Sequence, residues 1–201
     1  NTTGRDHPGA DEVIAHHETN WRKVIDRLTG PVPNGRSIYY QKHMSHHLLP
    51  EIGRAWLGEV TNGFLIREPR EVITSYVKKA GDPNLEDTGY PQLVEIFERV
   101  RENTGRTPPV LDAKDVLENP RRMLGLLCDA LGVEFTDDML SWPPGLRETD
   151  GVWAKHWYAE VEKSTSFRPY SPKLDPVPEH LRDLCDRCEE QYQRLFAERL
   201  R

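Results

Sequence analysis

The hydrophobic positions of the chain alternate between helical spacing and short apolar runs. Residues 10–29 carry apolar residues at helical intervals and stop at a Gly-Pro pair, which predicts a helix broken near Thr19. Two runs of β-branched and aromatic residues, 37–41 and 62–67, predict strands, and the pattern of residues 48–60 between them predicts a helix. This order is β-α-β, and it implies parallel pairing of the two strands with a right-handed crossover.

The remaining pattern continues the alternation of helices and strands. A third short strand is predicted at residues 108–113, and a proline-rich crossing segment at 167–178. Loop composition marks residues 141–151, and helices are predicted at 68–79, 90–103, 120–132, 152–164 and 179–200. The pattern therefore predicts an α/β fold with a short parallel sheet flanked by helices and a helix-rich C-terminal half.

The length and composition favour one domain of a soluble protein. The chain has 201 residues, of which 36% are hydrophobic and 30% are charged. No apolar stretch approaches the roughly 20 residues of a membrane helix, so no membrane partner is expected. The formal net charge of −6 argues against generic nucleic-acid binding, although it is compatible with a local basic pocket for a small anion.

The three cysteines indicate a reducing compartment, and we expect the cytoplasm. Cys185 and Cys188 form a C-x-x-C, which is one pattern of a zinc site. Both also fall on an apolar stripe at helical spacing, and a second pair of ligands is lacking. Core packing is therefore the favoured interpretation.

Candidate chemistry gathers where the predicted strands end, because ligands of open parallel sheets bind beyond the carboxyl ends of the strands. Lys42 and His43 follow the first predicted strand, and Arg67 follows the second. Arg67 precedes a helix whose free amides favour an anion, and Ser75 could add a hydroxyl. The alternative is a structural arginine paired to a neighbouring glutamate.

Two stretches of this sequence resemble a known family. "KHMSHHLLP" followed by "FLIREPREVITSYVKK" is similar to the motifs of sulfotransferases that use 3′-phosphoadenosine 5′-phosphosulfate. In the first motif His43 matches the family histidine and the Leu-Leu-Pro run matches as well. In the second, Arg67 and Ser75 have the family's arginine-to-serine interval. The resemblance implies a three-layer fold like that of P-loop nucleotide hydrolases, with residues 1–201 as a single sulfotransferase-like domain.

The resemblance also implies roles for particular residues. His43 would be the general base that takes the proton of a hydroxyl or amine acceptor, and Lys42 would supply a cation near the transferred group. Arg67 and Ser75 would hold the 3′-phosphate of the donor, and Arg168 would close over it from a later loop. A small-molecule acceptor is expected and no metal is, while the pattern predicts neither the acceptor's identity nor an oligomeric state.

Three departures from the family pattern stand out. The family lysine lies two residues before the histidine, where this chain has Gln41, and the family proline is replaced by Ser45. The glycine- and serine-containing loop that holds the 5′-phosphosulfate is not found before Lys42, and the opening "TTGRDHPG" has no strand ahead of it. Because the sequence starts at Asn1 rather than at methionine, we expect that the chain is truncated and that this βα unit belongs to the part ahead of Asn1. The alternative is a degenerate family member that cannot hold the sulfate end of the donor.

Several alternatives remain open. The histidines of the first motif could suggest a metal site, but no nearby carboxylate or cysteine completes a ligand set, so His46 and His47 are interpreted as rim residues. Trp153, His156 and Trp157 share a helical face, which favours packing over an acceptor-pocket wall. Besides a sulfotransferase, the chain could be a non-catalytic relative that binds a nucleotide or a protein, or a small-molecule kinase.

Overall fold

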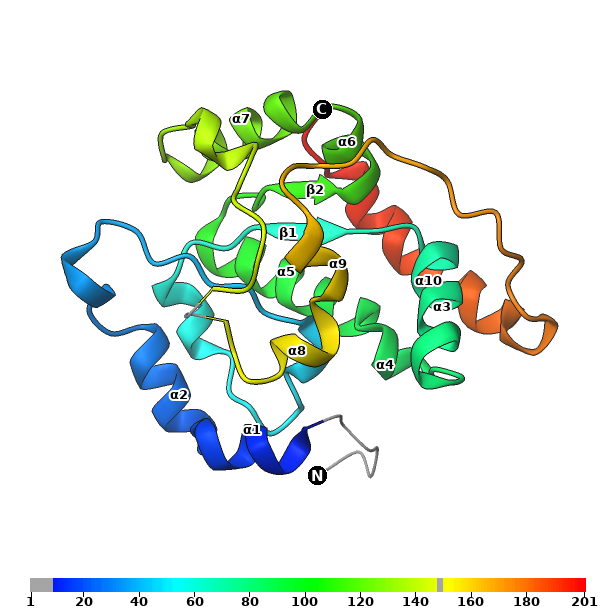
Figure 1. Cartoon of the computed structure of the whole chain (residues 1–201), viewed down its shortest axis with the longest axis horizontal. Coiled ribbons are helices and arrows are strands. Elements are labelled where there is room, and N and C mark those ends of the chain that lie inside the picture. Colours follow the sequence, from blue (N-terminus) through cyan, green and yellow to red (C-terminus); the bar gives the residue numbers. More distant parts are fainter. Residues whose placement is uncertain (1–8, 148–149) are drawn as a thin grey trace. The chain divides into compact units, whose positions relative to one another are not determined.

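The computed structural model describes residues 9–147 and 150–201, which form two compact units. Figure 1 labels the helices and strands. The larger unit joins Ile38–Thr136 to Arg168–Arg201, and the smaller unit joins the residues up to Ser37 to Asp137–Phe167. The sequence expectation for the first eight residues lies outside the described part of the chain. The prediction of one domain over 1–201 stays a prediction.

The larger unit contains the sheet and most of the helices. Its strands are β1 (Phe64–Ile66) and β2 (Val110–Asp112). Its helices are α3 (Pro69–Ala80), α4 (Leu85–Thr88), α5 (Tyr90–Thr104), α6 (Ala113–Glu118), α7 (Pro120–Leu131) and α10 (Arg182–Ala197), with short 3-10 turns η2 (Ser45–His47), η3 (Ala55–Glu59) and η5 (Glu179–Leu181). Strands and helices thus alternate, which confirms the predicted α/β class.

The helix ends follow the punctuation of the sequence. Pro69 and Pro120 stand in the first turns of α3 and α7, where a missing N–H does no harm. The helices α5 and α7 end at Gly105 and Gly132, whose φ angles of 64° and 69° are left-handed. These ends agree with the predicted ranges to within one or two residues.

The two strands form a parallel pair, which confirms the predicted short parallel sheet, although the pairing expected from the sequence was between 37–41 and 62–67. Phe64 pairs with Val110 and Ile66 pairs with Asp112. The outer edge of β2 is met by the C-terminal residues, because Val110 also bridges Arg199 in parallel and its carbonyl accepts a hydrogen bond from the amide of Leu200 at 2.9 Å. Residues far apart in the sequence therefore complete the sheet.

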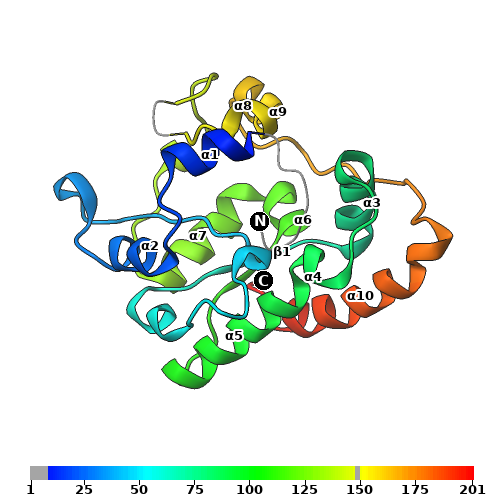
Figure 2. The same ribbon diagram turned by 90° about the horizontal axis from the view of Figure 1, so that it is seen from below.

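The core of the larger unit lies between the sheet and the long helices. The helix α10 packs against α3, α5 and both strands, and Figure 2 shows α5 and α10 along the same side of this unit. Ile66, Val110 and Leu195 are buried there, and the ring centroids of Phe64 and Phe97 lie 5.4 Å apart. The packing of the C-terminal helix on the body is thus confirmed.

Two predictions in the first motif region are wrong. Residues 37–41 form no strand but an exposed irregular segment, and residues 48–60 form turns and the short η3 rather than a helix. Tyr40 is 83% exposed, so its β-propensity finds no neighbouring strand to pack against. Lys42 and His43 consequently do not lie at a strand exit, and the first β-α-β unit does not form within the described residues.

The smaller unit is built from short helices. Its elements are α1 (Ala10–His16), α2 (Trp21–Leu28), η1 (Pro33–Gly35), η4 (Asp137–Met139), α8 (Ala154–Trp157) and α9 (Ala159–Lys163). The break predicted near Thr19 is confirmed, because the side chain of Asn20 caps α2 by accepting a hydrogen bond from the amide of Arg22 at 3.0 Å. The predicted helix at 152–164 is split into α8 and α9 at Tyr158.

The C-x-x-C lies on α10. Cys188 is fully buried and Cys185 is half-buried, so the core interpretation is confirmed for Cys188. Burial raises the pKa of both thiols, which keeps them protonated near neutral pH.

None of the described helices has the length and apolar character needed to cross a bilayer.

Candidate functional site

Arg67 lies between the end of β1 and the start of α3, as predicted. Its Nε donates a hydrogen bond to Oε2 of Glu71 at 2.8 Å, and its Nη2 lies 2.7 Å from the same oxygen. The side chain of Glu71 is 4% exposed, whereas that of Arg67 is 42% exposed. The arginine–glutamate pair that the sequence left as an alternative is therefore present, and the exposed part of the guanidinium keeps donors for a ligand.

Glu71 is an ionised carboxylate in a buried position. Its Oε1 accepts a hydrogen bond from the phenol of Tyr170 at 2.8 Å, while Oε2 serves Arg67. Burial by itself raises the pKa of Glu71, but the hydrogen bonds from Arg67 and Tyr170 outweigh it and hold the pKa below the usual value. Glu71 thus fixes the position of Arg67 through a charged contact.

The proline-rich segment lies along α3. Besides the contact of Tyr170, Nε of Arg70 donates to the carbonyl of Asp175 at 3.2 Å, and Nζ of Lys78 lies 2.7 Å from the carboxylate of Asp175. The ring of Tyr170 lies 5.6 Å from Nζ of Lys114, a cation–π distance. The segment therefore brings side chains from late in the sequence to the start of α3.

Lys173, in the same segment, adds a second cation near Arg67. The pKa of Lys173 is lowered, first by burial and then by the positive charge of Arg67. Two neighbouring cations that repel each other are stabilised by an anion, and the N-terminal end of a helix such as α3 also favours negative charge. The start of α3 is consequently suited to a phosphate or sulfate group.

Ser75 and Arg168 lie in the larger unit with this cluster. Ser75 is half-buried on α3, one helical turn beyond Glu71 and on the same face. Arg168 is exposed and begins the segment that carries Tyr170 and Lys173. The ligand roles expected for both residues stay predictions.

His43 lies in an irregular segment ahead of η2. Its Nε2 is 3.1 Å from Oε1 of Gln41, and its ring centroid lies 5.7 Å from that of Trp56. Because an amide oxygen only accepts, Nε2 carries the hydrogen in this contact and Nδ1 keeps its lone pair. Partial burial lowers the pKa of His43, so the imidazole is neutral near pH 7 and can accept a proton.

In the first motif, Gln41 stands where the sulfotransferases that this chain resembles have a lysine. Gln41 contacts the histidine, while the neighbouring Lys42 is exposed. Among the described residues no hydrogen bond or ion pair to Lys42 is found. The catalytic role of Lys42 stays a prediction.

His46 and His47 form the short turn η2. Their rings pack edge to face with centroids 4.3 Å apart, and burial lowers the pKa of His46 while Asp87 partly opposes this. Within residues 9–147 and 150–201, no three side chains of His, Cys, Asp or Glu gather in the way a metal ion requires.

A short path of hydrogen bonds joins the two motifs. The hydroxyl of Ser45 donates to the carbonyl of Gly89 at 2.9 Å, and the phenol of the next residue, Tyr90, donates to the carbonyl of Arg67. Gly89 has a φ of 76°, and a side chain there would overlap Oγ of Ser45. Through these two hydrogen bonds, the start of α5 contacts both the segment that contains His43 and the backbone of Arg67.

The aromatic residues Trp153, His156 and Trp157 lie around α8 in the smaller unit. The ring of Trp153 packs edge to face on Tyr158 with centroids 5.0 Å apart, which fits the packing interpretation. His156 is exposed, and Trp157 is 41% exposed, so the shared face is only partly covered.

Tyr170 and Lys173 were not singled out from the sequence, and Glu71 entered only as an unspecified glutamate near Arg67. Glu71 could have been found, because it lies one helical turn after Arg67, where an ion pair is favoured. No local pattern could assign Tyr170 or Lys173, since their contacts depend on the path of an irregular segment.

Comparison with family models identifies one family. Residues 1–195 match the family model described as a sulfotransferase domain. Two proteins of Arabidopsis thaliana are similar: branched-chain-amino-acid aminotransferase-like protein 1 is 34% identical over 87% of this chain, and branched-chain-amino-acid aminotransferase-like protein 2 is 31% identical over 93%. The aligned parts are 30% and 33% of those proteins, so the chain spans about a third of the length of the curated relatives it matches.

Among solved structures, the chain is similar to a sulfotransferase domain from the curacin biosynthetic pathway. The sequence identity is 17% and the TM-score is 0.43, over 70% of this chain and 58% of that one.

Proposed function

The chain belongs to the sulfotransferase domain family, and from this premise we propose that it moves a sulfuryl group from 3′-phosphoadenosine 5′-phosphosulfate to a hydroxyl or amine of a small-molecule acceptor. The observation that carries the proposal is the pair of neighbouring cations, Arg67 and Lys173, at the N-terminal end of α3. We place the 3′-phosphate of the donor there, with Ser75 as a hydroxyl donor and Arg168 as a further cation.

His43 is the proposed general base. Nδ1 takes the proton of the acceptor as the acceptor's oxygen or nitrogen bonds to sulfur, and the bond between sulfur and the 5′-phosphate oxygen breaks. The products are the sulfated acceptor and 3′-phosphoadenosine 5′-phosphate. The neutral state of His43 near pH 7, which follows from the lowered pKa of the imidazole, supports this role. Lys42 is proposed to offset negative charge on the transferred group.

One observation favours a second candidate, a non-catalytic relative that binds the nucleotide. Gln41 occupies the position of the family lysine and contacts His43, so a cation that the reaction uses is displaced to Lys42. A small-molecule kinase is a third outcome of the test below. The three free cysteines support a cytoplasmic location, which is part of the proposal.

Thermal unfolding with added nucleotides tests the function. We expect 3′-phosphoadenosine 5′-phosphate at 100 times its Kd to stabilise the protein by about 2.7 kcal/mol, and AMP, which lacks the 3′-phosphate, to do so far less. Arg67→Ala should abolish the effect, while Arg99→Ala, a partly exposed arginine on α5, should not. Stronger stabilisation by ATP would indicate a kinase, and stabilisation without sulfuryl transfer would indicate the non-catalytic relative.

Activity tests the base. With 3′-phosphoadenosine 5′-phosphosulfate and a panel of hydroxyl and amine acceptors, His43→Asn should lower kcat by about 10²- to 10⁴-fold. Stabilisation by 3′-phosphoadenosine 5′-phosphate should be unchanged in this variant. Equal turnover in His43→Asn and the parent would exclude His43 as the base.

A further inference from the structure

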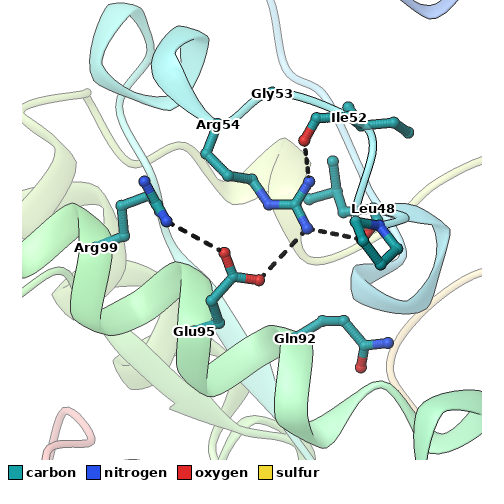
Figure 3. Close-up of a pocket in the computed structure, with 8 residues that line it drawn as sticks. Leu48, Ile52, Gly53, Arg54, Gln92, Glu95 and Arg99 are labelled. Atoms are coloured by element: carbon teal, nitrogen blue, oxygen red, sulfur yellow. Dashed lines mark hydrogen bonds and ion pairs between the residues drawn. The ribbon is translucent and has the colours of Figure 1, made fainter.

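The segment that follows His43 is held by the side chain of Arg54. Nη2 of Arg54 donates to the carbonyl of Leu48 at 2.8 Å, and Nη1 donates to the carbonyl of Leu49 at 3.0 Å and to that of Ile52. Figure 3 shows the contacts with Leu48 and Ile52. One guanidinium thus gathers three carbonyls of the same turn. We name residues 44–54 the clamp loop.

The clamp loop contacts α5 through η2, but its turn at residues 48–54 leaves an open space toward that helix. An open depression of about 430 Å³ lies between the loop and that helix, lined by Leu48, Pro50, Ile52, Gly53, Arg54, Gln92, Glu95 and Arg99. A loop that stands over such a space gains little from dispersion contacts across it. The hydrogen bonds from Arg54 span this part of the loop.

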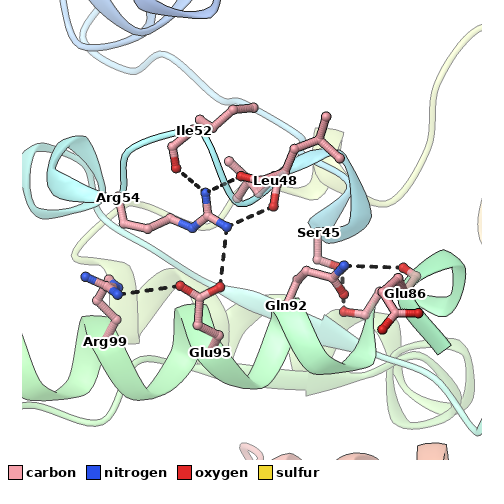
Figure 4. Close-up of polar contacts among 10 residues, drawn as sticks. Ser45, Leu48, Ile52, Arg54, Glu86, Gln92, Glu95 and Arg99 are labelled. Atoms are coloured by element: carbon pink, nitrogen blue, oxygen red, sulfur yellow. Dashed lines mark hydrogen bonds and ion pairs between the residues drawn. The ribbon is translucent and has the colours of Figure 1, made fainter. Parts of the chain in front are cut away.

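Arg54 is itself fixed to α5. Its Nη2 lies 3.4 Å from Oε2 of Glu95, whose other oxygen lies 3.6 Å from Nη2 of Arg99 (Figure 4). The side chain of Arg54 is 8% exposed, whereas those of Glu95 and Arg99 are 42% and 48% exposed. Of the three side chains Arg54, Glu95 and Arg99, Arg54 is the most buried, and its guanidinium joins the clamp loop to α5.

The clamp loop joins His43 to its aromatic neighbour. The chain leaves His43, passes through the turn gathered by Arg54 and returns to Trp56, which is buried and has its ring 5.7 Å from that of His43. At the other end of the loop, the hydroxyl of Ser45 donates to the carbonyl of Gly89. Opening the turn would loosen the link between His43 and Trp56, while the contacts of Gln41 with His43 and of Ser45 with Gly89 would remain.

From these contacts we infer that Arg54 is a positioning residue that sets the place of the His43 imidazole by holding the clamp loop closed. The inference rests on the proposed function, in which His43 is the base. Arg54 acts only through the loop and through Trp56. A displacement of a catalytic group by about 1 Å lowers turnover about 100-fold, so a clamp of this kind is able to control the rate.

The test compares Arg54→Met and Arg54→Lys with Arg99→Met as the matched control. Arg99 contacts the same carboxylate but none of the loop carbonyls in the contacts of the described residues. In Arg54→Met we expect kcat to fall about 100-fold and KM for the sulfuryl donor to stay within about twofold. Arg54→Lys should be intermediate, because one ammonium cannot span three carbonyls, and Arg99→Met should resemble the parent.

A second readout does not depend on turnover. NMR titration of the His43 ring in Arg54→Lys should give a pKa closer to the ordinary 6.5, since the ring loses burial against Trp56. This variant also carries the test if Arg54→Met does not fold. An unchanged His43 titration and unchanged kcat in a folded Arg54 variant would overturn the inference. If the parent neither binds 3′-phosphoadenosine 5′-phosphate nor transfers sulfuryl groups, the proposed function fails, and the titration still decides the role of Arg54.

Discussion

Tyr170 donates the hydrogen of its phenol to Oε1 of Glu71 at 2.8 Å, which ties the proline-rich segment to the first turn of α3. The other carboxylate oxygen of Glu71 holds Arg67. The position of the predicted anion ligand is therefore set by a residue that lies about a hundred positions later in the chain.

Glu71→Gln is expected to destabilise the protein. The substitution removes the charge that holds Arg67, and we expect the free energy of unfolding in urea to fall by about 1–3 kcal/mol at pH 7. Because the pKa of Glu71 is lowered in the folded state, this stabilisation is present above the ordinary pKa of 4.5 and lost as the pH falls through the folded value. The difference between variant and parent should shrink below that pH.

Glu118→Gln is the control for that measurement. Glu118 is 52% exposed and lies 3.8 Å from Lys114, so its replacement should change the free energy of unfolding by less than about 0.5 kcal/mol. Equal changes in the free energy of unfolding for Glu71→Gln and Glu118→Gln would show that the buried Arg67–Glu71 pair stabilises the protein no more than an exposed pair does.

Tyr170→Phe removes one hydrogen bond and keeps the ring. We expect a loss of about 1 kcal/mol in the free energy of unfolding at pH 8. Burial, together with the hydrogen bond to Glu71, raises the pKa of Tyr170 to about 12. The neutral phenol therefore stabilises the fold below the ordinary pKa of 10.0, and this contribution is lost as the pH rises from 10.0 to about 12.

Urea titrations across the alkaline range check the Tyr170 prediction. The gap between parent and Tyr170→Phe should close in that interval, whereas Tyr40→Phe, at an 83% exposed position, should match the parent throughout. A gap that stays constant up to the alkaline end would contradict the assignment.

Gly89→Ala should lower the thermal stability by more than the strain of its positive φ alone explains. Both Gly89 and Gly105 have positive φ, at 76° and 64°, and alanine in this conformation costs about 1 kcal/mol or more. At Gly105 a Cβ meets nothing within 4 Å, but at Gly89 it overlaps Oγ of Ser45. Gly89→Ala should therefore lower Tm more than Gly105→Ala.

The double variant Gly89→Ala with Ser45→Ala tests the cause. Removing Oγ relieves the overlap, so the double variant should be less destabilised than the sum of the two single effects. Strict additivity of the changes in Tm would mean that the hydroxyl is not the obstacle.

The thiols of α10 should react slowly in the folded protein. Burial raises the pKa of Cys185 and Cys188, so little thiolate is present at pH 7.5. With a disulfide reagent in native buffer, Cys188 should react more slowly than the half-buried Cys185, and both should react at once in urea. Fast native labelling of Cys188 would contradict its packing.

Local rules predicted most of the longer helices well, although no helix formed at 48–60 and the one at 152–164 is split. Pro69 marks the start of α3, Gly105 marks the end of α5, and Asn20 caps α2, because each of these residues acts on its own backbone or on that of a near neighbour. The parallel sheet was also predictable, since its two short apolar runs are separated by segments with helical periodicity.

Predictions that depended on partners outside the local sequence were less accurate. Residues 37–41 have strand composition, but a strand forms only where another strand lies beside it, and none does in the described residues. The site shows the same limit. Arg67 and its pairing with Glu71 are local, whereas Tyr170 and Lys173 reach it through a segment without periodicity.

The bridge between Val110 and Arg199 has a consequence for biosynthesis. During synthesis the outer edge of β2 stays without its partner until the ribosome has added nearly ninety further residues. A strand edge that waits this long is open to pairing with other nascent chains. Chaperones that shield such edges should therefore matter more for the yield of this protein in cells than for its stability once folded.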